Sequence, residues 1–121
     1  MTHNVGAVNS IGNAIFLAGE ERCANPGTTF MFHGVGFDVQ NMRLEERDLV
    51  GRLDSVRADQ TRIGSIIKDR ARFPNEKEIE ELFLQAATKD AEFAKDRGII
   101  DEIREAKVPR GTPIIQLIFK R

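Results

Sequence analysis

Tryptophan and tyrosine are both absent from this chain, which carries a single cysteine, Cys23, and two histidines, His3 and His33. One cysteine excludes a disulfide within the chain and a zinc site built from several of its thiolates. Two histidines disfavour a multi-histidine centre, so we expect neither a metal nor a cofactor. The eight phenylalanines lie mostly in apolar patterns, so we expect them in the core rather than stacked on nucleobases. The expected core positions are Phe30, Phe32, Phe83 and Phe119.

The chain also lacks a strong net charge, a long apolar run and a leader-like start. Eighteen basic and 19 acidic residues leave a formal charge of −1, so no general field attracts nucleic acid or an anionic membrane. No apolar run approaches the roughly 20 residues that cross a bilayer. The start, Met-Thr-His-Asn, does not read as a signal peptide. We therefore expect a soluble, cytoplasmic protein that binds neither nucleic acid nor membrane.

What is present is an ordinary globular composition. The chain has 121 residues, of which 40% are apolar and 31% are charged, which suits one small domain spanning 1–121. Strand-like and helix-like patterns alternate along it, and this alternation indicates the α/β class.

The first third of the chain combines small side chains with a strong turn signal. The small and apolar residues between Asn4 and Gly19 predict a loop or strand end that enters a short helix at about Asn9 to Ser10. Asn25-Pro26-Gly27 is a turn. The β-branched and aromatic run 28–32 predicts a buried strand that ends at His33.

A helical pattern runs from about residue 41 to residue 73, where Pro74 ends it. Its apolar stripe consists of Leu49, Leu53, Val56, Ile63 and Ile67. A helix of about 33 residues is about 50 Å long, whereas a compact domain of this size is about 35 Å across. The helix therefore either breaks at Gly51 or Gly64, or projects and needs a partner for its stripe. The second case predicts a homo-oligomer.

The rest of the chain is expected to alternate helices and strands. The expected elements are a helix over 76–85, a helix over 91–97 that Asp90 caps and Gly98 ends, a strand over 99–103, a turn over 109–113 and a strand over 114–119. An apolar edge strand invites aggregation. We therefore expect 114–119 to pair within the fold or across an interface.

Ser10 is the candidate nucleophile, because a serine where a loop enters a helix lies beside unpaired backbone N–H groups. Such a serine needs a base, and His33 stands at an ordered strand end. His3, near the start of the chain, is expected to be exposed and without a role. From the residues alone, the alternative is a helix cap and a loop histidine. The catalytic hypothesis predicts that Ser10 Oγ lies within about 4 Å of a His33 ring nitrogen.

Taken together and in order, these segments resemble the proteolytic subunit of the Clp protease (ClpP). The similarity covers about 5–103 and is carried by Ser10-Ile11-Gly12, Ala18-Gly19, Asn25-Pro26, Phe30-Met31-Phe32-His33, the long helix and the stretch from Asp90 to Asp101. It implies an α/β fold of the ClpP/crotonase type, in which the helix over 41–73 is the handle through which rings meet face to face.

The resemblance also implies a function, that of a serine endopeptidase working inside an oligomeric ring. Ser10 would be the nucleophile, His33 the general base, and the backbone N–H of Ile11 one oxyanion donor. The implied partners are further copies of the chain, an ATP-dependent unfoldase or a ClpP-like subunit, and polypeptide substrates, with no metal or cofactor.

The sequence departs from the family in two ways. It matches only the family's C-terminal half, so the strands and the Gly-Gly loop that supplies a second oxyanion donor are expected to be missing; losing one donor costs on the order of a hundredfold in rate. Counting back from Gly98, the family's aspartate falls on Leu82, with Glu81 beside it. The alternative is therefore a truncated or degenerate subunit that keeps the fold and the assembly surface. An acyl-CoA enzyme of the same superfold is a weaker third hypothesis, which the Ser10–His33 pair disfavours.

Overall fold

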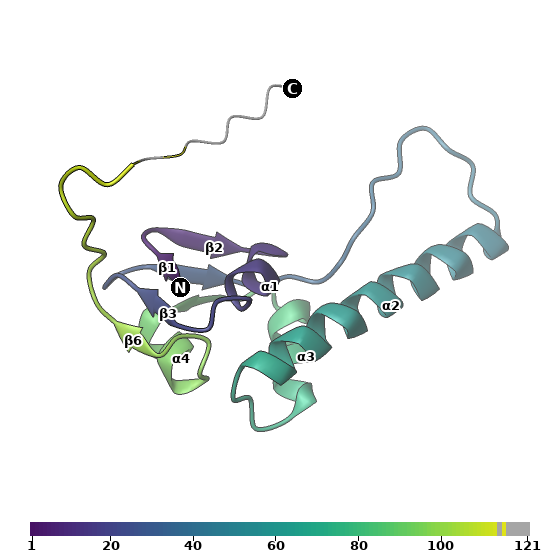
Figure 1. Ribbon diagram of the computed structural model, residues 1–121. Coiled ribbons are helices and arrows are strands. Elements are labelled where there is room, and N and C mark those ends of the chain that lie inside the picture. The colour runs from purple at the N-terminus through teal and green to yellow at the C-terminus, as the bar shows by residue number, and fades with distance from the viewer. Residues whose placement is uncertain (114, 116–121) are drawn as a thin grey trace.

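Two small sheets lie side by side in the computed structural model, which describes residues 1–113 and 115 (Figure 1). The first sheet has the order β1–β3–β6 and the second β2–β4–β5. The strand bounds are β1 Thr2–Asn4, β2 Ala7–Asn9, β3 Arg22–Ala24, β4 Thr29–Met31, β5 Thr88–Asp90 and β6 Glu102–Ile103. The helix bounds are α1 Gly12–Phe16, α2 Glu46–Arg70, α3 Glu76–Leu84 and α4 Ala91–Asp96. The predicted α/β class is confirmed.

The two sheets are continuous along the chain, because β2 follows β1 and β4 follows β3. β1 is parallel to β3 and β2 is parallel to β4. Between these pairs the backbone stays hydrogen-bonded, because Asn25 N donates to Asn4 O at 2.9 Å and Thr29 N donates to Gly6 O at 3.1 Å. Asn9 pairs with Met31 at the end of the parallel β2–β4 ladder. The residues that follow β2 and β4 therefore leave the sheet at the same end.

Aromatic side chains between the sheets and the helices form the centre of the core. Phe30 is fully buried, and its ring meets that of Phe16 edge to face with 5.3 Å between centroids. Phe32 and Phe83 are buried in the same cluster. These three phenylalanine predictions hold, and Phe119 lies outside the described residues.

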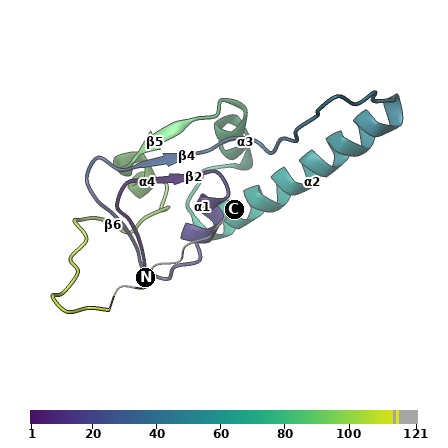
Figure 2. The ribbon, with the colours of Figure 1, turned by 90° about the horizontal axis from the view of Figure 1, so that it is seen from above.

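α2 is one unbroken helix that passes through both glycines and projects away from the strands (Figures 1 and 2). Its 25 residues correspond to about 37 Å, so projection, and not a break, is the correct alternative. The predicted start at residue 41 is wrong, because Asn41 has a φ of +47°. The helix begins after Glu45, whose N–H donates to Asp48 Oδ2 at 3.0 Å in a capping box.

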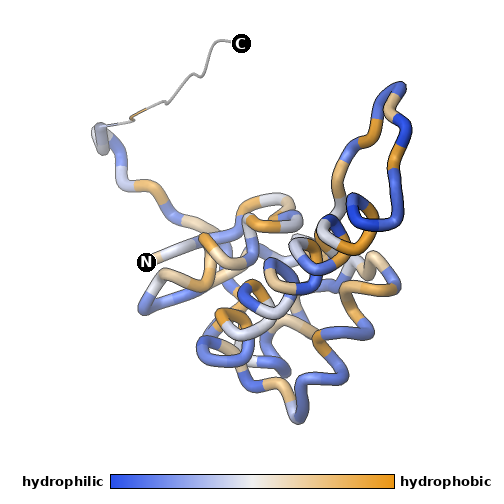
Figure 3. The backbone as a smooth tube through the Cα atoms, turned by 90° about the vertical axis from the view of Figure 1, so that its right-hand side faces the viewer, coloured by the Kyte–Doolittle hydropathy of each residue, from blue (hydrophilic) through white to orange (hydrophobic). Residues whose placement is uncertain are grey.

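The projecting half of α2 is poorly covered by the rest of the described chain. Leu49, Val50 and Leu53 remain 51%, 52% and 46% exposed, and Ile67 at the inner end is the buried residue of this helix. The segment 35–45 runs outward to the start of α2 and lies beside its outer half (Figure 1), and Figure 3 shows apolar residues in this loop. In the described residues no helix is both long enough and apolar enough to traverse a bilayer.

Helices α3 and α4 begin and end close to where the sequence predicts. Asn75 Oδ1 accepts from Glu78 N at 3.0 Å, and Asp90 Oδ1 accepts from Phe93 N at 2.8 Å. Gly98 has a φ of +62°, and a Cβ at this position would collide with the Arg72 side chain. Only glycine combines this conformation with so close an approach.

One predicted strand is too long, and three short strands lie where none was expected. The strand expected over 99–103 is reduced to β6, because the N–H groups of Ile99 and Ile100 both donate to Ala94 O at the end of α4. β1, β3 and β5, each of three residues, were not predicted. The turn over 109–113 is present and closes with Thr112 N donating to Pro109 O at 3.2 Å. The predicted strand over 114–119 lies outside the described residues except at Ile115, which is not in a strand.

Candidate active site

Ser10 occupies a strained turn between β2 and α1. It follows the last residue of β2 directly. Its φ is +56°, in the left-handed region that residues other than glycine rarely adopt. Its N–H donates to Met31 O at 2.9 Å, which holds the turn against the end of β4. A strained serine between a strand and a helix is the backbone arrangement that exposes a nucleophile in serine hydrolases.

The backbone of Ile11 offers a donor at the same turn. Ile11 is the residue that precedes α1, and its N–H donates to no acceptor within the described part of the chain. Its side chain is 53% exposed. The expected loop-to-helix entrance is therefore present, one to two residues later than predicted, and it carries a backbone donor next to Ser10.

His33 stands just past β4, at the sheet end where Ser10 leaves β2. The neighbouring backbone is fixed, because Phe32 N donates to Ala87 O at 2.8 Å and Gly34 N donates to Phe83 O at 3.1 Å. The exposed imidazole makes one hydrogen bond, between Nδ1 and Gly34 O at 2.7 Å. A carbonyl oxygen can only accept, so Nδ1 carries the proton and Nε2 of the neutral ring keeps its lone pair.

Ser10 and His33 line one cavity of about 450 Å³. The rest of its wall is mostly apolar and includes Ile11, Phe32, Val35, Ile63, Ile66 and Phe83. No hydrogen bond between the Ser10 hydroxyl and the His33 ring occurs among the described side chains. The two predicted residues thus line the same cavity, but the Ser10 hydroxyl and the His33 imidazole are not hydrogen-bonded to each other.

The position expected for the family's aspartate brings no carboxylate to the cavity. Leu82 is buried in the core, and Glu81 is exposed and pairs with Lys77 at 3.8 Å. Neither lines the cavity, whereas Asp59 of α2 does, with one oxygen 3.2 Å from Arg62. Asp59 was not among the site residues predicted from the sequence. The signal was its spacing, since positions 59, 62, 63 and 66 share one helix face.

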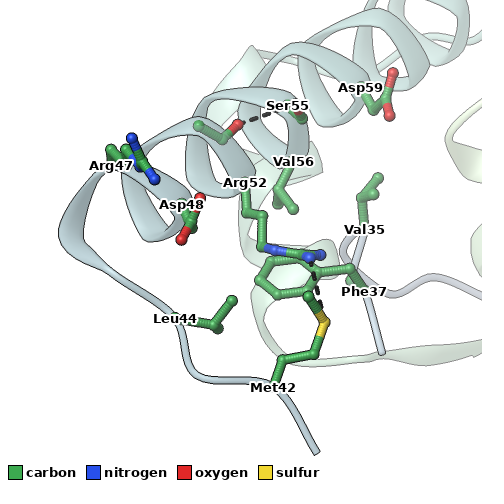
Figure 4. A pocket seen from close by; sticks show the side chains of 12 residues that line it. Val35, Phe37, Met42, Leu44, Arg47, Asp48, Arg52, Ser55, Val56 and Asp59 are labelled. Atoms are coloured by element: carbon green, nitrogen blue, oxygen red, sulfur yellow. Dashed lines mark hydrogen bonds between the residues drawn. The ribbon is translucent and has the colours of Figure 1, made fainter. Parts of the chain in front are cut away.

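A second cavity of about 560 Å³ adjoins the first and lies between the segment 35–45 and the outer half of α2 (Figure 4). Val35 and Asp59 line both cavities. The guanidinium of Arg52 lies 4.9 Å from the centre of the Phe37 ring. This contact joins the segment 35–45 to the outer half of α2.

His3 is half-buried and makes hydrogen-bond contacts, so the expectation that it is exposed and without a role is wrong. Its Nε2 lies 2.9 Å from Asn25 Oδ1 and 3.0 Å from Arg104 O, where it joins β1 to the segments after β3 and β6. Cys23 is buried and accepts from Arg104 Nε at 3.3 Å. Across the described residues no group of three or more histidine, cysteine or acidic side chains is arranged to hold a metal ion.

Comparison with known proteins assigns the family. The family model described as Clp protease matches residues 1–107. A search of the curated proteins found no match. Because the matched region covers most of the chain, including both Ser10 and His33, this chain belongs to the Clp protease family.

Proposed function

We propose that this chain is a ClpP-like serine endopeptidase subunit of the ClpP/crotonase fold, in which Ser10 is the nucleophile and His33 the general base. The observation that carries the proposal is the strained turn at Ser10, with a φ of +56°, opening onto the same cavity as His33. Membership of the Clp protease family supports the same reaction class.

The proposed reaction begins with attack of Ser10 Oγ on the peptide carbonyl carbon while the serine proton passes to His33 Nε2. The negative charge that develops on the carbonyl oxygen is stabilised by the N–H of Ile11, which donates to no acceptor among the described residues. Collapse of the tetrahedral intermediate expels the amine, which takes the proton from His33. Water then attacks the acyl ester in the same way, with His33 again as the base.

His33 is oriented by the Gly34 carbonyl rather than by a carboxylate. The 2.7 Å contact fixes the ring and selects the tautomer that presents Nε2 to the serine. A neutral carbonyl stabilises the imidazolium less than a carboxylate does. We therefore expect a slow enzyme compared with one that has a complete triad. Bound substrate would also have to draw Ser10 and His33 into hydrogen-bond contact, as catalytic groups tighten on binding.

The proposal extends to assembly. The outer half of α2 presents Leu49, Val50 and Leu53 half exposed, which suits a handle that packs on a second copy of the chain in an oligomeric ring. An ATP-dependent unfoldase or a ClpP-like partner subunit would then supply unfolded polypeptide. The mostly apolar wall of the Ser10–His33 cavity suits an apolar side chain of that polypeptide.

A structural subunit with little or no activity is the second candidate function. It is favoured by Leu82, a buried core residue at the position where the family has its aspartate, and by the lack of a hydrogen bond between Ser10 and His33 among the described residues. In this alternative the fold and the assembly surface remain while the chemistry is lost.

A fluorophosphonate probe distinguishes the two functions. We expect the probe to label the wild-type chain on Ser10, located by peptide mass spectrometry, and Ser10→Ala to lose the label. Ser65→Ala is the matched control, because Ser65 is an exposed serine of α2 whose hydroxyl donates to Thr61 O. His33→Gln should slow labelling by a factor on the order of 10² to 10⁴. If the wild type takes no label, alone or with a ClpP-like partner subunit, the structural alternative replaces the enzyme.

A further inference from the structure

We infer that Asn13 is a positioning residue of this site, and that its buried amide holds the Ser10 turn in its reactive shape. The inference rests on the proposed function, because it assigns a task toward the proposed nucleophile. Asn13 lies in α1, three residues after Ser10, and is 1% exposed. Its side chain is not among those that line the cavity, so it acts through the backbone of the turn.

Four hydrogen bonds converge on two carbonyl oxygens at this turn. Asn13 Nδ2 donates to Ser10 O at 3.0 Å and to Met31 O at 2.8 Å. The backbone N–H of Asn13 donates to Ser10 O at 3.0 Å, and that of Ser10 donates to Met31 O at 2.9 Å. Both protons of the amide are thus used, and the turn is joined to the end of β4, two residues before His33.

The amide is more than a requirement of folding. Without it, Ser10 O would still accept from Asn13 N, and Met31 O from Ser10 N. The residue also carries a cost, because Asn13 Oδ1 is buried and has no hydrogen-bond partner among the described residues. An apolar side chain of similar volume would avoid that orphan acceptor. A residue that breaks a local rule in this way is expected at a functional site.

The task of the amide follows from the peptide plane between Ser10 and Ile11. In a trans peptide the C=O and the N–H point in opposite directions. Holding the Ser10 carbonyl with two donors therefore also fixes the direction of the Ile11 N–H, the proposed oxyanion donor. The same contacts oppose relaxation of Ser10 from its φ of +56° toward the ordinary helical region. Asn13 thereby orients the nucleophile and its oxyanion donor together.

The test compares Asn13→Leu with Thr28→Val. Thr28 is the matched control because it is a buried polar residue that loses one hydrogen bond, from its hydroxyl to Asn25 O at 2.8 Å, away from Ser10. For fluorophosphonate labelling of Ser10 we expect Asn13→Leu to lower the maximal rate constant about tenfold to hundredfold. The probe concentration at half-maximal rate should stay unchanged, because the cavity wall is intact. Thr28→Val should leave both values unchanged.

Amide hydrogen exchange supplies a readout that does not depend on activity. In Asn13→Leu the Ser10 amide should exchange about tenfold faster or more. The Thr29 amide, which donates to Gly6 O within the same sheet region, should keep its protection and report that the fold is intact. If Asn13→Leu does not fold, Asn13→Ser, which is smaller and can supply one donor, is measured in its place.

The outcomes separate this inference from the proposed function. A wild-type chain that takes the label, together with an Asn13 variant that reacts at the wild-type rate, overturns the positioning role and leaves the enzyme. A wild-type chain that takes no label contradicts the proposed enzyme, and hydrogen exchange then tests whether the Asn13 amide holds the Ser10 turn. Equal exchange of the Ser10 amide in wild type and variant would show that it does not.

Discussion

The last turn of α2 contributes a buried side chain to the core, whereas the first three turns have no residue buried by the described chain. Ile67 is 1% exposed and packs in the same buried cluster as Ile79 and Phe83 of α3. Arg70 donates from Nε to Leu17 O at 3.0 Å and from its guanidinium to Gly19 O at 3.1 Å, which joins the helix end to α1. At the outer end, Leu49 and Leu53 are about half exposed.

The two halves carry the same apolar spacing, so the spacing does not explain the difference. A periodic stripe specifies which face of a helix is apolar. Whether a given turn is covered depends on which other elements the chain brings beside it. Here α1 and α3 pack beside the inner half of α2 (Figures 1 and 2), and the segment 35–45 lies beside the outer half. The exposed part of the stripe is therefore the part that a second polypeptide would cover.

The largest expected effect comes from deleting one side chain in each half of α2. Ile67→Ala should lower the free energy of unfolding by about 2–5 kcal/mol, because it empties a buried site. Leu53→Ala should change it by about 0.5 kcal/mol or less in the isolated chain, because the side chain is already half in water. Urea unfolding at low protein concentration measures both. Equal losses would mean that the outer half is covered after all.

The next effect concerns association of the chain with itself. Leu53→Asp places a charge on the exposed stripe, so we expect it to dissociate the oligomer that we propose the wild type forms through this surface. Ala58→Asp is the control, since it adds the same charge to the same helix at an exposed position outside the stripe. Multi-angle light scattering reads both. A wild-type particle of 13.6 kDa, the mass of one chain, would contradict the predicted homo-oligomer.

A smaller effect on stability is expected at the start of α4. Asp90→Ala removes the side chain that accepts from Phe93 N at the start of α4, which should cost about 1 kcal/mol. Asp96→Ala, at the other end of the same helix, should be neutral or slightly stabilising, because a negative charge is unfavourable near a helix C-terminus. Thermal unfolding of the two variants measures the difference. Equal melting temperatures would show that the Asp90 cap does not stabilise α4.

The sequence predicted the elements whose local signals are strong. The caps at Asn75 and Asp90 and the stop at Gly98 are recognisable from residue type, so α3 and α4 were placed within a residue or two. The long helix was correct in kind but began five residues late, because nothing local announces the left-handed backbone of Asn41. β1, β3 and β5 were missed, since three residues are too few to show an alternating pattern and strand pairing is decided by distant partners.

At the site, the position of each residue along the chain predicted more than its residue type did. A serine after one parallel strand and a histidine after its neighbour leave the sheet at the same end, so their shared cavity follows from topology. Asp59 could not be found in this way, because it reaches the cavity from α2, and the contact depends on how that helix packs. Asn13 was equally hidden, since its role depends on two carbonyl oxygens from different elements.

The smallest expected effect is a dependence on pH where α2 meets α3. Lys68 of α2 pairs with Glu76 of α3; this hydrogen bond and the opposite charge lower the pKa of Glu76 and raise the pKa of Lys68. The contribution of Glu76 is therefore present above its unfolded pKa of about 4.3 and is lost as the pH falls through the lower folded value. That of Lys68 is present below about 10.4 and is lost as the pH rises through its higher folded value.

Between roughly pH 5 and pH 10, wild type should therefore melt slightly above Glu76→Gln, and the gap should close in acid. The gap is small because both groups are exposed and screened by water and salt. Glu81→Gln is the control, since Glu81 pairs with Lys77 inside α3 and joins no second element. A gap of the same size at pH 3 and pH 7 would show that Glu76 acts through packing. A gap that closes in acid and narrows in high salt would show that an ion pair helps to hold the inner end of α2 against α3, whereas no ion pair between described residues joins the outer end to another helix or strand.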